Sequence, residues 1–388
     1  MRPLRSFRSG GLPSRAVRPG IALSTTVLMA LMTVTACGGP PTGSSDPASA
    51  ADSKAAAYER FARMSGPART AALVKAAKAE GEVNVYTSNE KLQALVAGPF
   101  SRKYGIKVNI FRAQSEDLLQ RVLQEDSANK PKNDLVDATN FELGVLSDKK
   151  ILARYDSDLR KRLSAQAQIP AGWVTTRFNA LTVVRNTEKV PAADVPRSLQ
   201  DLTDPKWKGR LSMELSDSNW YMTLWDHLTA AGRSEAEITR LFKGIAANAK
   251  TVQGHVKLND LLAAGEGAIG VTAYNRLALT AKAKGAPLAA DTGIEPIVLV
   301  PSGAAPMTRA AHPAAALLFI DFLLTDAQAA YAEDMDVVSN PSAVPGHRPV
   351  LPAGVETVTV DTVKYVRESS AWSKAYENLL RGHEPVRP

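Results

Sequence analysis

Apolar and polar residues along this chain follow two periods in turn, that of a strand and that of a helix. Residues 82–86 (EVNVY) and 106–111 (IKVNIF) alternate and are rich in β-branched and aromatic side chains, which predicts strands. Helical spacing precedes the first strand over 66–80, and it follows the second strand from Ser115, the expected N-cap. Strand, polar turn and helix in repeated order predict an α/β protein with a parallel sheet.

The alternation continues to the end of the chain without an internal repeat of fixed period. The further strands that it predicts lie at 134–139, 179–185, 268–273 and 297–300. The further helices lie at 90–100, 140–150, 220–231, 234–247, 312–324 and 361–380.

Polar turns lie next to three of the predicted helices, at Thr87–Glu90, Ala113–Glu116 and Thr139–Phe141. Ligands of open α/β sheets bind beyond the carboxyl ends of the strands, where such turns meet. The helix N-termini there carry unpaired N–H groups and a partial positive charge, which suit an anionic or oxygen-rich ligand. The alternative is that Ser88 and Ser115 only cap their helices.

The first 36 residues differ in charge from the rest of the chain. They hold five Arg and no acid, so the remainder has 42 of the 47 basic residues against all 39 acidic residues, or +3 of the total +8. A nucleic-acid interface needs a concentrated basic surface, so we expect no nucleic-acid partner. The apolar run 21–35 behind these Arg residues is typical of a secretory signal and is short for a membrane-spanning helix.

The single cysteine of the chain ends this signal-like segment, in Val34-Thr35-Ala36-Cys37-Gly38, which resembles the bacterial lipobox. One cysteine also excludes a disulfide framework and a Cys-rich zinc site. Several acyl chains on Cys37 would anchor the protein stably; the alternative is a buried Cys in a plain secretory signal. Residues 38–57 are small and polar, which is typical of a tether. We expect a signal peptide over 1–36, the lipidated Cys and flexible tether over 37–65, and an extracytoplasmic body that touches the membrane only through its lipid.

Enzyme motifs are absent or misplaced. No P-loop, nucleophile elbow or HExxH occurs. Residues 265–270 (GEGAIG) match GxGxxG, but they follow a predicted helix and lead into a strand, the reverse of the order that binds a dinucleotide. The five His residues have no second ligand at metal-binding spacing, so we expect surface or capping roles, with His312 starting a helix. We therefore expect no enzyme and no resident cofactor.

Several stretches together resemble the iron(III)-type branch of the extracellular solute-binding proteins, the capture subunits of ABC importers. The most specific is 204–211 (DPKWKGRL), which is similar to the DPKWKG segment of that family. The others follow in the family's order between about 82 and 345: VYTS at 85–88, SEDLLQR at 115–121, RNT at 185–187, GAP at 285–287, HP at 312–313 and FIDFL at 319–323.

The resemblance implies the type II periplasmic-binding-protein fold, in which two α/β lobes hold a ligand cleft at a hinge. Carried over, lobe 1 would comprise 66–177 and the return and C-terminal helices at 297–388, and lobe 2 would comprise 178–296. Closing such a cleft excludes water and strengthens every polar contact to the ligand. The resemblance also implies a monomer that delivers its ligand to the permease of an ABC importer.

The resemblance leaves the cargo open between iron(III) and a small anionic solute, such as a phosphonate, a phosphate ester or a carboxylate. Iron-binding members supply two adjacent Tyr, and often a His or Tyr from the first turn. This chain has one Tyr at the paired position, Tyr274, and Glu90 in the first turn. If the cargo is iron, Tyr274, Tyr221 and Glu90 are the expected metal ligands.

An organic anion would instead suit Lys91, Arg177 and Arg276, with Trp220 and Tyr221 as stacking surfaces. The alternatives are that the two aromatic residues belong to the core and that Arg177 forms an ion pair. The complete set of expected ligand-binding residues is Thr87, Ser88, Asn89, Glu90, Ser115, Asn140, Arg177, Asn219, Trp220, Tyr221, Tyr274 and Asn275.

We therefore expect a lipid-anchored, extracytoplasmic binding protein of an ABC import system that captures iron(III) or a small anionic solute by closing its lobes. The alternative is a lipid-anchored enzyme or sensor component on the same fold. An enzyme would need an acid–base pair in the cleft, and Glu90 is the one candidate there, without an evident partner.

Overall fold

The computed structural model describes residues 47–169 and 172–383, with side chains from residue 55 onward. The predicted signal peptide, Cys37 and the first part of the tether therefore lie outside the described residues. Within these ranges, no helix has by itself the length and apolar character to cross a membrane. Helices α10 (Pro313–Leu323) and α11 (Asp326–Glu333), bent by 48° to one another, meet that criterion only as a pair.

One mixed sheet of 11 strands runs through the described residues in the order β2-β1-β3-β9-β4-β7-β5-β6, with β8 and β10 beside β4 and β11 beside β9. β1 pairs in parallel with β2 and β3, and β5 pairs in parallel with β6 and β7, as the βαβ pattern predicts. Between these parallel parts, β9 is antiparallel to β3 and β4, and β4 is antiparallel to β7. The strands are β1 (Glu82–Thr87), β2 (Lys107–Arg112), β3 (Leu135–Thr139), β4 (Val174–Asn186), β5 (Leu211–Glu214), β6 (Ala249–Val252), β7 (Ile269–Tyr274), β8 (Leu288–Ala289), β9 (Ile297–Pro306), β10 (Val337–Val338) and β11 (Thr357–Thr359).

Helices connect the parallel strands, close to the predicted ranges. The predicted helix at 90–100 is a π-helical turn, η1 (Gln93–Ala97), that continues into α3 (Gly98–Tyr104). The other α-helices are α1 (Pro47–Ala62), α2 (Gly66–Glu80), α4 (Ser115–Ser127), α5 (Asn140–Asp148), α6 (Ser218–Ala230), α7 (Glu235–Asn248), α8 (His255–Ala263), α9 (Asn275–Ala283) and α12 (Thr362–Leu380). Short 3-10 turns are η2 (Asp158–Arg162), η3 (Ala165–Ala167), η4 (Ala192–Asp194), η5 (Gln200–Thr203), η6 (Pro205–Trp207) and η7 (Pro341–Ala343).

The expected N-cap at Ser115 is wrong by one position. Ser115 is the first residue of α4, Gln114 is the N-cap, and neither side chain caps the helix. By contrast, Ser234 and Glu237 form a complete capping box at the start of α7, a reciprocal pair that satisfies two otherwise unpaired N–H groups.

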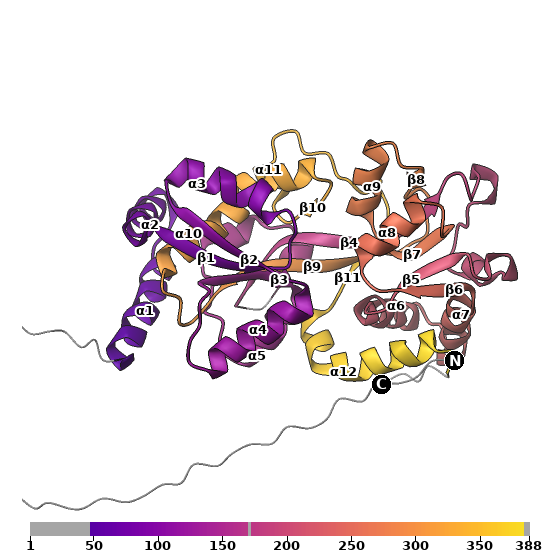
Figure 1. The fold of residues 1–388 in the computed structure, drawn as a ribbon, viewed down its shortest axis with the longest axis horizontal. Helices are drawn as coiled ribbons and strands as arrows, with labels where there is room; N and C mark the ends of the chain where they lie inside the picture. The colour runs from indigo at the N-terminus through magenta and orange to yellow at the C-terminus, as the bar shows by residue number, and fades with distance from the viewer. Residues whose placement is uncertain (1–46, 170–171, 384–388) are drawn as a thin grey trace, which may run out of the picture. The chain divides into compact units, whose positions relative to one another are not determined.

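Two groups of elements surround separate hydrophobic cores, and Figure 1 shows them at the two ends of the sheet. We call β1–β3 with α2–α5, α10 and α11 lobe 1, and β5–β7 with α6–α9 lobe 2. β4 and β9 contribute to both cores: Phe178 and Leu299 pack in lobe 1, and Leu181 and Val298 pack in lobe 2. These two antiparallel strands therefore join the lobes, as the fold with two lobes and a hinge requires.

The C-terminal helix α12 packs on lobe 2. Tyr365, Trp372 and Tyr376 on its buried side belong to the lobe 2 core together with α6 and α7. The predicted lobe boundaries stay a prediction, but we propose one change to them. Residues 362–380, assigned from the resemblance to lobe 1, belong with lobe 2 because their apolar side chains fill its core.

Helix α1 overlaps the segment predicted as a flexible tether over 37–65, so that prediction is wrong for its described part. The helix spans Pro47–Ala62, and Phe61 is buried in the lobe 1 core. The Tyr58 hydroxyl donates to the carbonyl oxygen of Met307 at 2.8 Å. Two large side chains among small ones thus fix the end of the helix to the body, and the small-residue composition did not indicate this.

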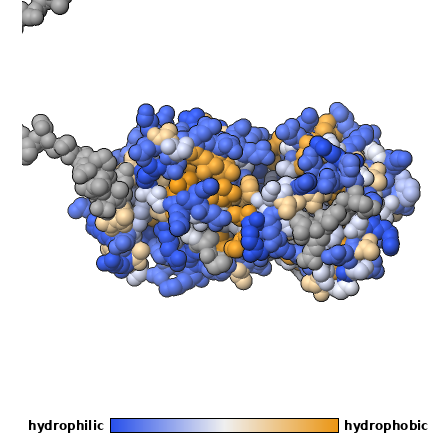
Figure 2. Space-filling view, turned by 90° about the horizontal axis from the view of Figure 1, so that it is seen from below, coloured by the Kyte–Doolittle hydropathy of each residue, from blue (hydrophilic) through white to orange (hydrophobic). Residues whose placement is uncertain are grey.

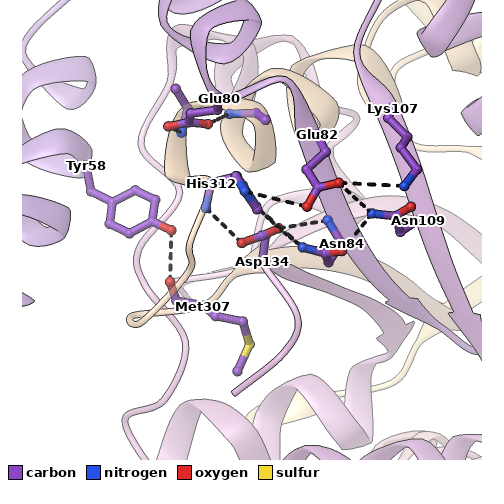
Figure 3. Close-up of polar contacts among 11 residues, drawn as sticks. Tyr58, Glu80, Glu82, Asn84, Lys107, Asn109, Asp134, Met307 and His312 are labelled. Atoms are coloured by element: carbon purple, nitrogen blue, oxygen red, sulfur yellow. Dashed lines mark hydrogen bonds and ion pairs between the residues drawn. The ribbon is translucent and has the colours of Figure 1, made fainter. Parts of the chain in front are cut away.

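A polar cluster fixes the start of α10 to the amino ends of β1 and β3 (Figure 3). Asp134 accepts hydrogen bonds from the backbone N–H of Asn84 at 2.7 Å and of His312 at 2.9 Å. Glu80 accepts from the backbone N–H of Ala314 and Ala315, at 3.0 and 2.7 Å. Carboxylates are favourable at a helix N-terminus, and His312 precedes the helix as predicted. The cluster lies at the opposite end of these strands from the predicted ligand site.

Most of the surface seen in Figure 2 belongs to hydrophilic residues, with one broad hydrophobic area on the lobe 1 half of that face. A hydrophobic area rimmed by polar residues is typical of a contact surface. Nothing in the structure indicates what would cover it.

Candidate functional site

The two lobes contact each other through the turns that follow their strands. In lobe 1 the turn 87–90 follows β1, and in lobe 2 Arg276 lies at the start of α9, directly after β7. Arg276 Nη2 donates to Glu90 Oε1 at 2.7 Å. The fold thus brings together the carboxyl ends of strands from both lobes, where open α/β sheets bind ligands.

A buried charge pair lies under the lobe 1 turn. Arg177 Nη1 donates to Asp137 Oδ1 at 3.1 Å, and both side chains are nearly inaccessible to solvent, at 8% and 0% exposed. Thr87 Oγ1 donates to the second oxygen of Asp137 at 2.7 Å and accepts from the backbone N–H of Asn89 at 2.9 Å. The Arg177 guanidinium also lies 5.3 Å from the ring centre of Tyr331. Arg177, Thr87 and Asn89, which the sequence predicts as ligand-binding, are therefore partners of one another or of Asp137.

Arg276 forms ion pairs with three carboxylates of lobe 1. Besides Glu90, its nitrogens lie 3.2 Å from Asp334 Oδ2 and 3.4 Å from Asp336 Oδ1, and Lys91 also pairs with Asp334. Burial raises the pKa of Asp336 to about 6, although Arg177 and Arg276 act to lower it. Burial acts to raise the pKa of Glu90 as well, but Arg276, a backbone hydrogen bond and Arg177 together outweigh it, so the net shift of this pKa is downward. Glu90 is therefore a stable carboxylate at neutral pH and a poor general acid.

Two carboxylates and a histidine face one another in lobe 2. Glu214 at the end of β5, Asp217 before α6 and His255 at the start of α8 place one ligand atom each within 4.8 Å of the others. His255 Nε2 forms an ion pair with Asp217 Oδ1 at 3.1 Å, and the other oxygen of Asp217 has no hydrogen-bond partner among the described residues. Oxygen and imidazole atoms that converge in this way suit a metal cation.

Tyr274 covers this cluster. Its ring stacks on the His255 ring with centres 3.7 Å apart and planes 4° from parallel. Burial, and then the carboxylates Asp217, Glu214 and Glu142, raise the pKa of the Tyr274 hydroxyl well above its ordinary value. Without a cation beside it, Tyr274 is therefore a neutral phenol at every physiological pH.

Trp220 and Tyr221 do not face this cluster, and the expectation that they contact a ligand is not supported. Both are buried in the lobe 2 core, at 3% and 0% exposed. The Tyr221 ring contacts Phe242 and Trp372 with ring centres 4.8 and 5.7 Å apart. The core alternative describes their environment, because the apolar side of α6 turns inward.

Tyr221→Phe distinguishes the core role from a ligand role. The Tyr221 hydroxyl is buried without a hydrogen-bond partner in the described residues, and such a group costs about 1–3 kcal/mol. We expect the variant to unfold in urea at the same concentration or a higher one, with unchanged affinity for ferric ion or phosphate ester. A tenfold loss of affinity would instead assign the hydroxyl to the ligand.

The other residues that were predicted to bind a ligand lie partly in this region and partly elsewhere in the structure. Asn140 Nδ2 donates to Thr362 Oγ1 at 3.1 Å, which ties α5 to α12. Asn275 is buried, and its side-chain nitrogen has no partner among the described residues. Asn219 Oδ1 accepts from the backbone N–H of Trp220, and the Ser88 N–H donates to the carbonyl oxygen of Asp137. For Ser115, at the start of α4, no contact with this region is found in the described part of the chain.

Sequence reasoning missed Glu214, Asp217 and His255. Asp217 lies two residues before Asn219, which was predicted to bind a ligand together with Trp220 and Tyr221, but Asp217 itself was not considered. His255 was given a surface or capping role because local spacing showed no second ligand. Its partner lies 38 residues earlier, so only the order of β5, β6 and β7 in the sheet could have revealed the pair.

Glu142, on α5 close to this region, is a buried acid with an altered pKa. Burial raises its pKa to about 7, and a hydrogen bond from Thr139 opposes the shift. Because the folded chain binds this proton more tightly than the unfolded chain, the free energy of unfolding falls as pH rises from about 4.5 to about 7.

Glu142→Gln should remove that part of the pH dependence. A pKa of about 7 against the ordinary 4.5 corresponds to about 3 kcal/mol, present at pH 4.5 and lost above pH 7. Urea unfolding at pH 5 and pH 8 should therefore show the variant gaining stability relative to the parent chain at the higher pH. The exposed Glu188→Gln is the control, and an equal pH dependence of both variants would contradict the buried-acid argument.

Comparison with known proteins places the chain in a family. The family model described as "Bacterial extracellular solute-binding protein" matches residues 138–361, more than half of the chain. Iron uptake protein A1 of Synechocystis is 27% identical over 178 residues, 45% of this chain and 49% of that protein. The chain thus spans about half the length of the curated relatives that it matches.

Two solved structures have the same fold as the described chain. The periplasmic binding protein AfuA from Actinobacillus pleuropneumoniae, with fructose-6-phosphate bound, has a TM-score of 0.66 at 20% identity, over 78% of this chain and 99% of that one. Iron-bound HitA from Pseudomonas aeruginosa has a TM-score of 0.62 at 18% identity, over 76% and 99%. These proteins are named for binding or uptake, which agrees with the expectation that the chain is no enzyme. The chain belongs to the bacterial extracellular solute-binding protein family and has the two-lobed periplasmic-binding-protein fold.

Proposed function

We propose that this protein is the lipid-anchored, extracytoplasmic binding subunit of an ABC importer and that its cargo is iron(III). The family membership supports a binding role outside the cytoplasm. Iron appears in the names of a relative from Synechocystis and of a similar structure from Pseudomonas aeruginosa. The binding of fructose-6-phosphate by another similar structure is the reason to test an anion as well.

The balance of charge where the lobes meet is the observation that favours a cation. Three basic side chains lie there, Lys91, Arg177 and Arg276, and each pairs with a carboxylate of lobe 1. Four acidic side chains contact them among the described residues, Glu90, Asp137, Asp334 and Asp336, and Glu214 and Asp217 lie in lobe 2 close to Tyr274. An anion would have to displace these carboxylates and would meet negative charge that no cation offsets. In a buried site, such an unpaired charge costs on the order of several kcal/mol. A trivalent cation would offset that charge.

The ion pairs of Arg276 support capture by lobe closure. Arg276 belongs to lobe 2, and its partners Glu90, Asp334 and Asp336 belong to lobe 1. Each contact forms only when the lobes approach, so these pairs favour the closed arrangement that an importer would recognise. β4 and β9, which join the lobes, are the candidate hinge.

Attachment through a lipid on Cys37 completes the proposal. The anchor would hold the protein beside its permease, and a monomer would suffice for delivery. Labelled fatty acid should be incorporated by the parent chain in a bacterial host and not by Cys37→Ser. Equal labelling of both chains would remove the anchor from the proposal and leave the binding role untouched.

Native mass spectrometry of the purified protein tests the cargo. After treatment with a chelator, the protein is mixed with ferric nitrilotriacetate or with fructose 6-phosphate, and the masses of the complexes are compared. We expect a one-to-one ferric adduct and no sugar phosphate adduct at equal concentration. A sugar phosphate adduct without a ferric one would overturn the choice of iron, and small-angle scattering on the same samples would show whether the lobes close.

A further inference from the structure

We infer that Glu214, Asp217 and His255 form the primary cation site of this protein, within lobe 2, with Tyr274 as an additional ligand. The inference rests on the proposed function, because it names the residues that hold the cargo. It differs from the ligand set expected from the resemblance, since neither Tyr221 nor Glu90 belongs to it. All of its members come from the carboxyl ends of β5, β6 and β7 or from the helices that follow them.

Glu214 is held in one orientation by hydrogen bonds from its surroundings. Its Oε2 accepts from the backbone N–H and the hydroxyl of Ser216, both at 2.6 Å, and its Oε1 accepts from the backbone N–H of Gly254 at 2.9 Å. Both lone pairs of Oε2 are therefore used, whereas Oε1 keeps a further lone pair for a cation. Such fixed carboxylates are what a metal site requires, because outer hydrogen bonds orient the direct ligands.

Asp217 supplies the observation that points to a ligand. The residue is 4% exposed, and its Oδ2 has no hydrogen-bond partner among the described residues. Its other oxygen forms an ion pair with His255 Nε2 at 3.1 Å. A buried carboxylate oxygen without a partner is costly in a folded protein. A cation beside Asp217 Oδ2 would satisfy this oxygen and take His255 Nε2 as a further ligand.

The backbone brings His255 to this place by a turn that needs glycine. Gly254, directly before α8, has φ = 92°, a left-handed conformation that other residues rarely adopt. This turn presents the Gly254 N–H to Glu214 and starts α8 at His255, so one conformation positions a carboxylate and an imidazole together. The side chains are thus placed by the backbone of three neighbouring elements.

Tyr274 would complete the site when iron(III) is bound. Its ring is parallel to that of His255, with the ring centres 3.7 Å apart. A bound metal cation reverses the local preference for the neutral form and deprotonates a coordinating group. Two carboxylates and one phenolate together carry three negative charges, which balance a trivalent cation, and the neutral imidazole would be the fourth ligand.

Affinity measurements on matched variants test the site. The metal-free protein is titrated with ferric nitrilotriacetate and, separately, with zinc(II) and manganese(II) salts, by calorimetry and by the metal-induced rise in melting temperature. We expect Asp217→Asn and His255→Gln each to weaken binding at least about 100-fold, because even the outer partners of metal ligands are worth 10–100-fold. Asp260→Asn, which removes one exposed carboxylate from the same helix as His255, should bind as the parent chain does. Tyr274→Phe should abolish the visible iron–phenolate absorption.

The outcomes separate this inference from the proposed function. If the parent chain binds ferric ion and both Asp217→Asn and His255→Gln bind it equally well, the site is wrong and the function stands. If the parent chain binds only zinc(II) or manganese(II), and these variants lose that binding, the site stands and the ferric cargo is wrong. Circular dichroism of each variant excludes misfolding, and loss of binding in one folded variant suffices to support the assignment.

Discussion

Replacing Arg177 with methionine should lower the free energy of unfolding by about 3–5 kcal/mol, the cost of removing one partner from a buried ion pair. Asp137 would remain buried, with no exposed surface, and would keep only the hydrogen bond from Thr87. Methionine fills much of the volume of the arginine side chain, so the loss reports the unpaired charge rather than a cavity. Urea unfolding followed by circular dichroism measures it.

A double-mutant cycle separates this effect from lost packing. Arg177→Met combined with Asp137→Asn removes both charges, so most of the lost stability should return. Arg154→Met is the matched control, because its ion pair with Asp156 lies on the surface and such pairs are worth about 0–1 kcal/mol. If Arg177→Met instead unfolds like the parent chain but loses its affinity for a sugar phosphate, Arg177 is a ligand residue after all.

Local patterns predicted many of the strands and helices because each depends on neighbouring residues, but they missed β5, β6, α8 and α9 of lobe 2. The alternation at 82–86 and the polar residues before α7 mark elements that the structure contains at nearly the same positions. The type II fold followed from the resemblance. The helical character of Pro47–Ala57 was missed, because small residues are common in both tethers and helices.

The candidate site was predicted only in outline. The resemblance implied that Glu90, in the first turn, and Tyr274 share one site, and in the structure the turns after β1 and β7 meet through Glu90 and Arg276. It could not indicate that Arg177 pairs with Asp137, because β9 lies between their strands in the sheet. Contacts of this kind depend on strand order, which no local period reveals.

The aromatic residues of α6 show a different kind of failure. Trp220, Leu224 and Leu228 recur every four residues and form an apolar stripe, as do Tyr221 and Trp225. That spacing is typical of a helix buried against a core, and it favoured the core alternative over a stacking surface. The ligand roles considered after the family resemblance outweighed the periodicity in our interpretation, whereas the structure places both residues in the core.

Trp372→Ala should cost about 3–5 kcal/mol of unfolding free energy, the usual loss when a buried Trp is truncated. Trp372 is 1% exposed, and its ring lies 5.7 Å from that of Tyr221 and 6.1 Å from that of Trp225. Urea unfolding of the metal-free protein measures the loss, and Trp372→Phe should recover more than half of it.

The same substitution should weaken cation binding, because α12 supports the site from behind. Tyr376 on this helix donates to the carbonyl oxygen of Glu214 at 2.8 Å, and Tyr365 lies 2.8 Å from the hydroxyl of Ser218. A helix loosened at Trp372 would release both contacts, so the backbone around Glu214 and Asp217 would lose its fixed position. Lys374→Ala, an exposed change on the same helix, should alter neither stability nor affinity. A Trp372→Ala protein that is destabilised by less than about 1 kcal/mol, well below the cost of truncating a buried Trp, would mean that α12 does not complete the lobe 2 core.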